Sequence, residues 1–504
     1  MTPIKNGGPA SGTHVTAVDT PVMTHRQVMT AMSGLMLGMF VAILSSTVVS
    51  TSLPRIVSDL GGTQSTYTWI VTATLLALTV STPVWGKLAD LFDRKLLVQT
   101  GLGIYVLGSA LAGLAPTSGW LIACRAIQGI GVGGLTALVQ VILSDLVSPR
   151  ERGRYSGYLG AVFGLGTVAG PLLGGVITDS IGWRWCFYVN VPFAIVALVV
   201  LQRTLHLPRR RRPVQLDYAG AALIAGGISS LLIWVSLAGH QFAWLGWQTP
   251  ALVALGAGLL GAAVAVERHA PQPIIPLRLL RDRTIVLAVI ASVAVGVALF
   301  GTTVFLTQYM QLARGQSPTE SGLLTIPMVV GLFVASTIAG RFVTRTGRYK
   351  RIMLRGAASL TAGLALMGTM DETTSLVELG VFMLLVGAGL GMLMQNMVLI
   401  VQNAVDRSDV GSGSALIAFM RTLGGAVGVS VLGAILAAKA GPAIPGAHVA
   451  AATRHAFGTG IAEIFLIASP LGLVVLASLA LMHEHPLGRR SGIELARREE
   501  ASAA

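Results

Sequence analysis

Long apolar runs separated by short polar stretches dominate this 504-residue chain. A helix of about 20 apolar residues is long enough to cross the hydrocarbon core of a bilayer, so each run is a candidate membrane-spanning helix. We predict an all-α polytopic membrane protein with fourteen transmembrane helices. They begin near Met29, Thr68, Leu96, Trp120, Tyr155, Trp185, Asp217, Thr249, Ile285, Ser321, Ile352, Val377, Gly411 and Gly460.

Composition supports this class. Hydrophobic residues make up 53% of the chain, charged residues only 11%, and the mean hydropathy is +0.74, whereas soluble domains carry about a quarter charged residues. The net charge of +14 would suggest a nucleic-acid partner in a soluble protein. Here the basic residues lie between apolar runs, so we expect membrane lipids as partners and no nucleic acid.

The distribution of basic residues predicts the orientation. An even number of helices places both termini on one side, and 28 of the 35 Lys and Arg residues fall on that side. By the positive-inside rule, both termini are expected to be cytoplasmic, in a multi-pass protein of the cell membrane. The polar tail up to about Arg26 has no short apolar segment or cleavage site, so the first apolar run is expected to be a retained helix rather than a signal peptide.

Two basic clusters divide the chain. The run from Arg209 to Arg212 follows the sixth predicted helix, and Arg278, Arg281 and Arg283 follow the eighth. The seventh and eighth helices therefore look like a pair inserted between two six-helix bundles. We predict tails at 1–27 and 483–504, bundles at 28–203 and 285–482, and basic loops with the inserted pair at 204–284. The clusters themselves are interpreted as topology signals and contacts with anionic lipids.

The two bundles contain related polar hairpins. GKLADLFDRK follows the second helix and GRFVTRTGRY follows the tenth, each with a glycine and an arginine eight residues later. Recurrence at matched positions is typical of transporters built from repeats. Either Asp90 makes charged contacts between moving helices and closes a gate, or the hairpins are solvated turns that set topology. The candidate gating residues are Gly86, Asp90, Arg94, Lys95, Gly340, Gly347 and Arg348.

A glycine-rich helix is predicted over residues 157–175, GYLGAVFGLGTVAGPLLGG. Glycines at four-residue spacing form a stripe that allows close helix approach, and the proline is expected to bend the helix. The stripe fits either a tight helix dimerisation face or a moving, gating helix. Its residues are Gly157, Gly166, Gly170, Pro171, Gly174 and Gly175.

Together, the first hairpin, the run Arg125–Gly131 and the glycine-rich helix resemble the major facilitator superfamily, and the glycine pattern is similar to that of its antiporters. Further residues resemble the fourteen-spanner drug:proton antiporter branch: Trp183, Arg184, Trp185, Phe187, Tyr188, Asn190, Pro192, Arg421, Gly424, Gly425 and Gly428. The resemblance implies alternating access around a central cavity. It also implies a cytoplasmic gating hairpin, an antiporter helix and a role for Arg125 in proton coupling.

The end of the first helix departs from that branch. The branch usually has an acidic residue where this chain has Ser45, and an amide where it has Ser50. A serine hydroxyl cannot hold the coupling proton or carry negative charge at neutral pH. The usual coupling site is therefore altered.

Few charged residues lie deep in the predicted helices, and those that do are arginines. Arg421 lies about 15 Å from its helix end, near the midplane, where a charge usually marks a functional path. Arg125 fits either that path or contact with the outer headgroups. Neutral amides, including Gln140 and Gln402, could be ligand contacts or bonds between helices. The candidate coupling and translocation residues are Ser45, Arg125, Gln128, Gln308, Gln311, Gln395, Asn396 and Arg421.

These observations predict a secondary transporter that exports small amphipathic molecules, such as drugs or antibiotics, by proton antiport. An exporter of a neutral or anionic metabolite or lipid, and a non-transporting membrane sensor that kept the fold, remain alternatives. No nucleophile and base pair or metal-ligand cluster recurs in the helices, so no enzyme activity, cofactor or metal is expected. The spacing of Cys124 and Cys186 indicates no disulfide framework, and we expect a monomer.

Overall fold

The computed structural model describes residues 25–62, 64–205, 217–238, 242–243, 246–270, 273–406, 409–440, 451–484 and 487. Within these ranges the protein is helical, with one isolated bridge between Ala238 and Phe242. The Arg209–Arg212 cluster lies outside the described residues, as do most of the two predicted tails. The elements are α1 (His25–Asp59), α2 (Gln64–Leu91), α3 (Arg94–Gly113), α4 (Ser118–Leu146), α5 (Pro149–Ser180), α6 (Trp185–Tyr188), α7 (Asn190–Thr204), α8 (Tyr218–Leu237), α9 (Gln248–His269), η1 (Leu277–Arg281), α10 (Arg283–Gln308), η2 (Tyr309–Ala313), α11 (Pro318–Leu324), α12 (Ile326–Thr346), α13 (Lys350–Met367), α14 (Leu376–Ala404), α15 (Val410–Ala440) and α16 (Ala451–Leu481).

Most helices begin within a few residues of the predicted positions. The larger differences are α5, which starts at Pro149 instead of near Tyr155, and α16, which starts at Ala451 instead of near Gly460. Both helices extend beyond their apolar run into a polar first segment, which an apolar scan does not detect. In α5 the first turn follows Ser148 with proline at its start, a position that proline favours.

Within the described residues, thirteen helical stretches are long and apolar enough to cross a membrane. The predicted helix near Ile352 corresponds to α13, which has only 18 residues and contains Lys350, Arg351 and Arg355. It nevertheless packs along α14 and α16. The fourteenth span therefore remains a prediction.

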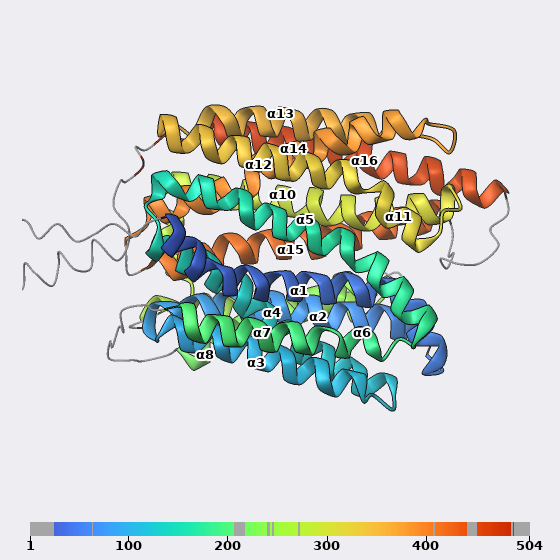
Figure 1. Ribbon diagram of the computed structural model, residues 1–504, viewed down its shortest axis with the longest axis horizontal. Coiled ribbons are helices and arrows are strands. Elements are labelled where there is room, and N and C mark those ends of the chain that lie inside the picture. Colours follow the sequence, from blue (N-terminus) through green and yellow to red (C-terminus); the bar gives the residue numbers. More distant parts are fainter. Residues whose placement is uncertain are drawn as a thin grey trace, which may run out of the picture.

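The helices form two layers (Figure 1). Helices α12, α13, α14 and α16 lie together on one side, α1 to α4 with α6 and α7 lie on the other, and α5 and α15 run between them. We call α1–α7 the N-terminal half and α10–α16 the C-terminal half. The two halves meet mainly where α2 packs on α15 and α5 packs on α12.

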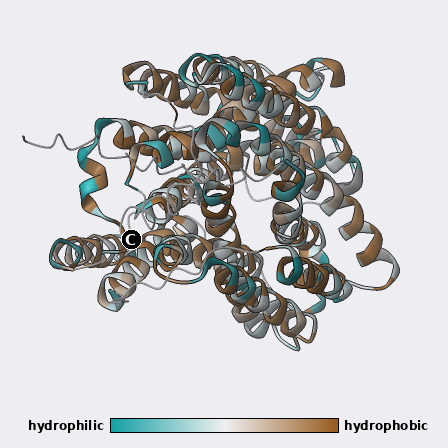
Figure 2. Ribbon diagram, turned by 60° about the vertical axis from the view of Figure 1, so that its left-hand side comes forward, coloured by the Kyte–Doolittle hydropathy of each residue, from teal (hydrophilic) through white to brown (hydrophobic). Residues whose placement is uncertain are grey.

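Helices α8 and α9 pack against each other and join the rest of the bundle through contacts of α8 with α2 and α15. Large apolar side chains remain exposed on the helices, including Leu255 and Val264 of α9 and Val330 and Val334 of α12. Most of the ribbon in Figure 2 is hydrophobic or neutral in hydropathy, with hydrophilic residues in short stretches. An apolar exterior of this kind requires lipid as its solvent, so the protein is a multi-pass membrane protein.

The start of α3 and the end of α7 meet through Lys95 and Gln202, and the start of α13 and the end of α16 meet through Lys350 and Met482. The turns after α2 and after α12 lie at one end of the bundle, on the left in Figure 1. We call this the hairpin end. It contains most of the polar contacts described next.

Candidate functional site: a polar seam at the hairpin end

Asp90 joins the two halves at the hairpin end. Its carboxylate, buried in the last turn of α2, accepts hydrogen bonds from the backbone N–H groups of Gly411 at 2.9 Å and Ser412 at 3.0 Å, and from the Ser412 hydroxyl at 2.9 Å. Since α15 begins at Val410, these are first-turn amides that have no partner within their own helix. Asp90 therefore caps α15 from the opposite half, and its charge is favourable at the positive end of the helix dipole.

Two glycines permit this contact. A Cβ atom built on Gly86 would collide with the Ala415 side chain and lie 3.0 Å from the Gly411 carbonyl oxygen. A Cβ atom on Gly411 would collide with the Asp90 carboxylate. Any side chain at either position would push α2 and α15 apart, because neither backbone can yield without loss of the cap.

Arg94 and Lys95 hold the first hairpin within its own half. The Arg94 guanidinium forms an ion pair with Asp145 of α4 and donates through Nε to the Ala89 carbonyl at 3.0 Å. The Lys95 ammonium donates to the Gln202 carbonyl at 2.8 Å. The contact between halves thus comes from Asp90 and backbone amides, and the two nearby cations brace the turn that carries Asp90.

The second hairpin is built differently. Gly347 has φ +70° and ends α12, its N–H donating to the Val343 carbonyl at 2.8 Å, and a positive φ of this kind favours glycine. Gly340 lies within α12, and Arg348 is exposed in the turn. Four residues after Gly340 stands Thr344, where the first hairpin has Asp90. The repeat therefore lacks the carboxylate that would cap a helix of the other half.

Arg152, which the sequence analysis did not single out, forms a second link between the halves. It is buried in the first turn of α5, and its Nη1 donates to the Gln402 side-chain oxygen at 2.5 Å. The Gln402 amide nitrogen in turn donates to the Gln140 carbonyl at 3.1 Å and to Ser414 Oγ at 2.8 Å. Burial lowers the pKa of Arg152 to about 9. Only the folded arrangement brings these four distant residues together.

A third link lies further from the hairpin end. The Gln140 amide nitrogen donates to the Gln395 side-chain oxygen at 2.8 Å. Gln140 therefore touches the other half twice, once through its carbonyl and once through its side chain. We call the Asp90, Arg152, Gln402 and Gln140 contacts the polar seam.

The glycine stripe of α5 packs on α1 within the N-terminal half. A Cβ atom on Gly170 would collide with Thr47, and one on Gly174 would lie 2.7 Å from the Val48 carbonyl oxygen. Thr47 also donates from its hydroxyl to the Gly166 carbonyl at 3.0 Å. Gly157, Pro171 and Gly175 lie in the same helix. The stripe is thus a close packing face inside this chain.

A second face of α5 meets the C-terminal half. A Cβ atom on Gly164 would collide with Val329 of α12, and one on Gly160 would lie 3.4 Å from Ser336 Oγ. Helix α5 therefore packs on both α1 and α12. Dimerisation through the stripe and movement of α5 both stay predictions.

Ser45 and Arg125 belong to one buried polar cluster in the N-terminal half. Arg125 donates from Nη1 to the Gln128 side-chain oxygen at 3.0 Å, and Gln128 donates to Ser109 Oγ at 2.7 Å. Tyr105 lies beside Ser45, Ser109 and Arg125. Arg125 Nε and Ser45 Oγ have no hydrogen-bond partner in the described part of the chain. Arg125 is 5% exposed, and Ser45, which like Arg125 lies beside Tyr105, stands where the resemblance implies an acid.

The remaining path residues are not gathered with that cluster. Arg421 lies in α15 where Gly296 of α10 approaches its backbone, and its side chain makes no hydrogen bond or ion pair to the residues described here. Asn396 donates to the Met392 carbonyl of its own helix at 2.7 Å. Gln308 and Gln311 lie at the junction of α10 and η2, half-buried. The eight predicted residues thus form separate groups in the two halves.

Two halves of membrane helices that meet along a polar seam are an architecture typical of transporters built from repeats. The fold is that of solved transporters. The human organic anion transporter MFSD10 (TETRAN) aligns with a TM-score of 0.64 and 17% identity, over 90% of this chain and 99% of that one. The proton:xylose symporter XylE aligns with a TM-score of 0.65 and 15% identity, over 94% and 99%.

Sequence comparison identifies the family. The sequence profile described as Major Facilitator Superfamily matches residues 35–429. The multidrug transporter protein MdtP of Bacillus subtilis is 35% identical over 81% of this chain and 75% of its own length. Multidrug resistance protein 3 of the same organism is 34% identical over 80% and 78%. The chain belongs to the major facilitator superfamily and is a membrane transporter with multidrug transporters among its relatives.

Proposed function

We propose that this protein exports small amphipathic molecules, including drugs or antibiotics, across the cell membrane in exchange for protons. The names of the relatives support the substrate class, since they include multidrug transporters from a bacterium. The capping of α15 by Asp90 across the two halves is the single observation that carries the mechanism. It is a contact that a transporter must break to expose its centre at the hairpin end.

In this proposal the hairpin end faces the cytoplasm together with both termini. The polar seam then closes the cytoplasmic side, and the bundle works as a monomer. Separation of α2 from α15 would leave Asp90 and the first amides of α15 to water, which can hydrogen-bond to both. Each hydrogen bond to the charged carboxylate therefore favours the closed state by about 1.5 to 3 kcal/mol. A difference of that size can be reversed by substrate binding.

The N-terminal cluster bears on substrate choice. An acid at the Ser45 position would neutralise Arg125, and here the guanidinium has only neutral neighbours. Arg421 in the other half likewise has no carboxylate among its described contacts. These two cations support a second candidate function, export of neutral or anionic amphiphiles. In either case the proton must be carried by a residue other than Ser45.

Transport by the purified full chain in sealed vesicles tests both candidates. An imposed pH gradient is applied, and uptake of a cationic, a neutral and an anionic amphiphile is followed separately. Gradient-driven movement of one of them supports a proton-coupled exporter, and the preferred charge distinguishes the two candidates. Absence of movement for all three would favour a sensor that kept the fold.

A further inference from the structure

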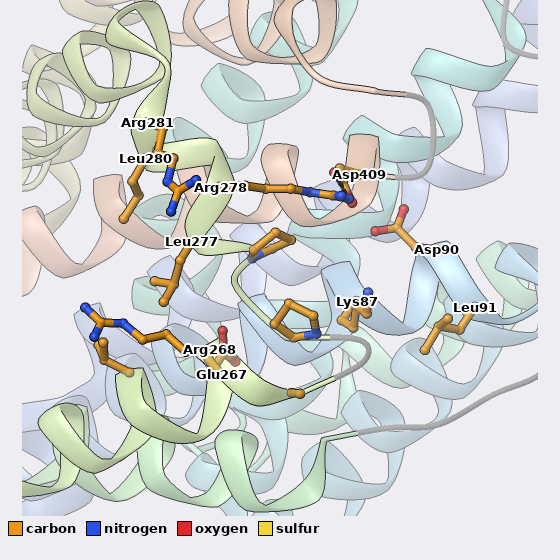
Figure 3. A pocket seen from close by; sticks show the side chains of 14 residues that line it. Lys87, Asp90, Leu91, Glu267, Arg268, Leu277, Arg278, Leu280, Arg281 and Asp409 are labelled. Atoms are coloured by element: carbon orange, nitrogen blue, oxygen red, sulfur yellow. Dashed lines mark hydrogen bonds and ion pairs between the residues drawn. The ribbon is translucent and has the colours of Figure 1, made fainter.

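A cavity of about 960 Å³ lies at the hairpin end beside the Asp90 cap (Figure 3). Its walls come from the last turn of α2, the last turns of α9, the linker that runs from α9 through η1, and the residue just before α15. The volume is within the range of small-molecule sites. The inserted helix pair thus encloses a space that neither half would form alone.

The acidic groups lining this cavity are already bound by the protein. Asp409 accepts from the Arg278 guanidinium at 2.6 Å. Glu267 accepts from the backbone N–H groups of Ile274 at 2.9 Å and Ile275 at 3.0 Å. Asp90 is held by the first turn of α15. Their oxygens are therefore largely satisfied, and they leave the cations of the cavity without strong partners.

Three cations in the lining lack such partners. Lys87 is 6% exposed on α2, and Arg268 and Arg281 line the cavity from α9 and η1. In the described part of the chain, none of the three makes a hydrogen bond or an ion pair, although Glu267 attracts Lys87 at longer range. A cation held largely out of bulk water is stabilised by an anionic partner, and the Lys87 side chain lines the cavity without one bound to it among the described residues. Figure 3 shows Lys87 on the α2 wall and Arg278 turned away from it toward Asp409.

Apolar side chains complete the wall and reach the outside of the bundle. Leu91 and Leu277 line the interior, and Val264 and Leu280 are about 40% exposed. Helix α9 buries little of its apolar surface in the protein, so lipid must cover it. The cavity therefore combines an unpartnered buried cation with an apolar border that continues onto a lipid-facing helix.

We propose that this cavity binds an anionic phospholipid, with the phosphate at Lys87 and the acyl chains along α9. Arg268 and Arg281 would add positive charge at the rim. The bound lipid would join α2 to the linker that holds Asp409 through Arg278, and so would favour the closed polar seam. The proposal does not depend on the identity of the substrate or on proton coupling.

The test measures lipid binding to the purified full chain in neutral detergent. Phosphatidylglycerol, phosphatidylcholine and inorganic phosphate are titrated separately, and the melting temperature and the mass of the intact complex are recorded. We expect saturable stabilisation by phosphatidylglycerol, with at least tenfold weaker effects of the other two. Lys87→Gln should weaken phosphatidylglycerol binding about tenfold. Arg351→Gln, which removes an exposed charge from α13 at the same end, should change it less than twofold.

Arg281→Gln provides a second variant at the rim in case Lys87→Gln does not fold, and it should weaken binding several-fold. Equal binding of phosphatidylcholine, or equal binding by the native protein and both cavity variants, would overturn the proposal. Saturation by inorganic phosphate at similar concentrations would show a free-phosphate site and would also overturn it. None of these readouts requires transport, so failure here is separate from failure of the proposed function.

Discussion

The Asp90 carboxylate lies 2.9 Å from the backbone nitrogen of Gly411, although the two residues are separated by 321 positions and belong to opposite halves of the protein. A side chain that caps a helix of the other half couples two events, the separation of the halves and the loss of a helix cap. In the proposed mechanism, opening of the hairpin end would therefore carry an electrostatic cost.

Replacement of Asp90 by Asn tests this coupling. The amide keeps the size of the side chain but loses its charge, so the bonds to Gly411 and Ser412 weaken by about 1 to 2 kcal/mol. We expect the closed hairpin end to be less favoured by about fivefold to thirtyfold, and transport in vesicles to fall while membrane expression stays normal.

Asp93→Asn is the matched control for that substitution. Asp93 begins α3 in the same hairpin, and its side chain accepts from the Lys95 N–H at 2.9 Å within its own half. Asparagine is also a good N-cap residue, so this variant should transport normally. Normal transport by Asp90→Asn would instead mean that the hairpin is only a turn that sets topology.

Arg152→Gln tests the second part of the polar seam. It removes the bond to Gln402 and two bonds to the Val147 and Ser144 carbonyls. We expect transport to decrease at least fivefold. Arg154→Gln, an exposed neighbour on α5, should remain active. Equal transport by the two variants would show that the Arg152 contacts of the polar seam are not required for transport.

Gly170→Leu tests the α1 and α5 packing face. The new side chain would meet both the side chain and the backbone of Thr47, and overpacking of this kind typically costs about 1 to 3 kcal/mol. We expect a lower melting temperature and loss of transport. Gly103→Leu on α3, where a Cβ atom meets nothing within 4 Å, should leave both unchanged. If Gly170→Leu behaves like this control, the close packing is not required.

Ser45→Asp tests the link between substrate charge and Arg125. A carboxylate at this buried position would pair with the guanidinium and restore the negative charge that the resemblance implies. Transport of cationic amphiphiles should rise and that of anionic ones should fall. Adding Arg125→Gln should abolish the shift in preference. An unchanged preference in Ser45→Asp would place coupling and selectivity at other residues.

Much of the fold follows from local patterns. The lengths of the apolar runs predicted the helices, because a helix that crosses the bilayer needs a continuous apolar surface against lipid or against its neighbours. Apolar patterns do not detect the polar first turns of α5 and α16, because these turns extend beyond the apolar runs. They also do not decide whether α13 crosses the membrane, because this helix has only 18 residues and three of them are basic.

The site was predictable only in part. The motif around Gly86 and Asp90 pointed to this hairpin, and its gating role stays a prediction. Two of the three donors to Asp90 are backbone N–H groups, which no side-chain pattern reveals. Arg152 and Gln402 are 250 positions apart and meet only in the folded bundle. The sequence patterns therefore indicated only the Asp90 part of the polar seam, and the Arg152, Gln402 and Gln140 contacts were found in the structure.

The most direct test measures the distance across the hairpin end. Cys124 and Cys186 are replaced by serine, spin labels are attached at Phe92→Cys and Arg348→Cys, which are exposed in the two hairpins, and the distance distribution is recorded by double electron–electron resonance. We expect one predominant short distance in the native background and a second, longer population when Asp90→Asn is added. Identical distributions with and without Asp90→Asn would contradict the claim that this residue holds the two halves together.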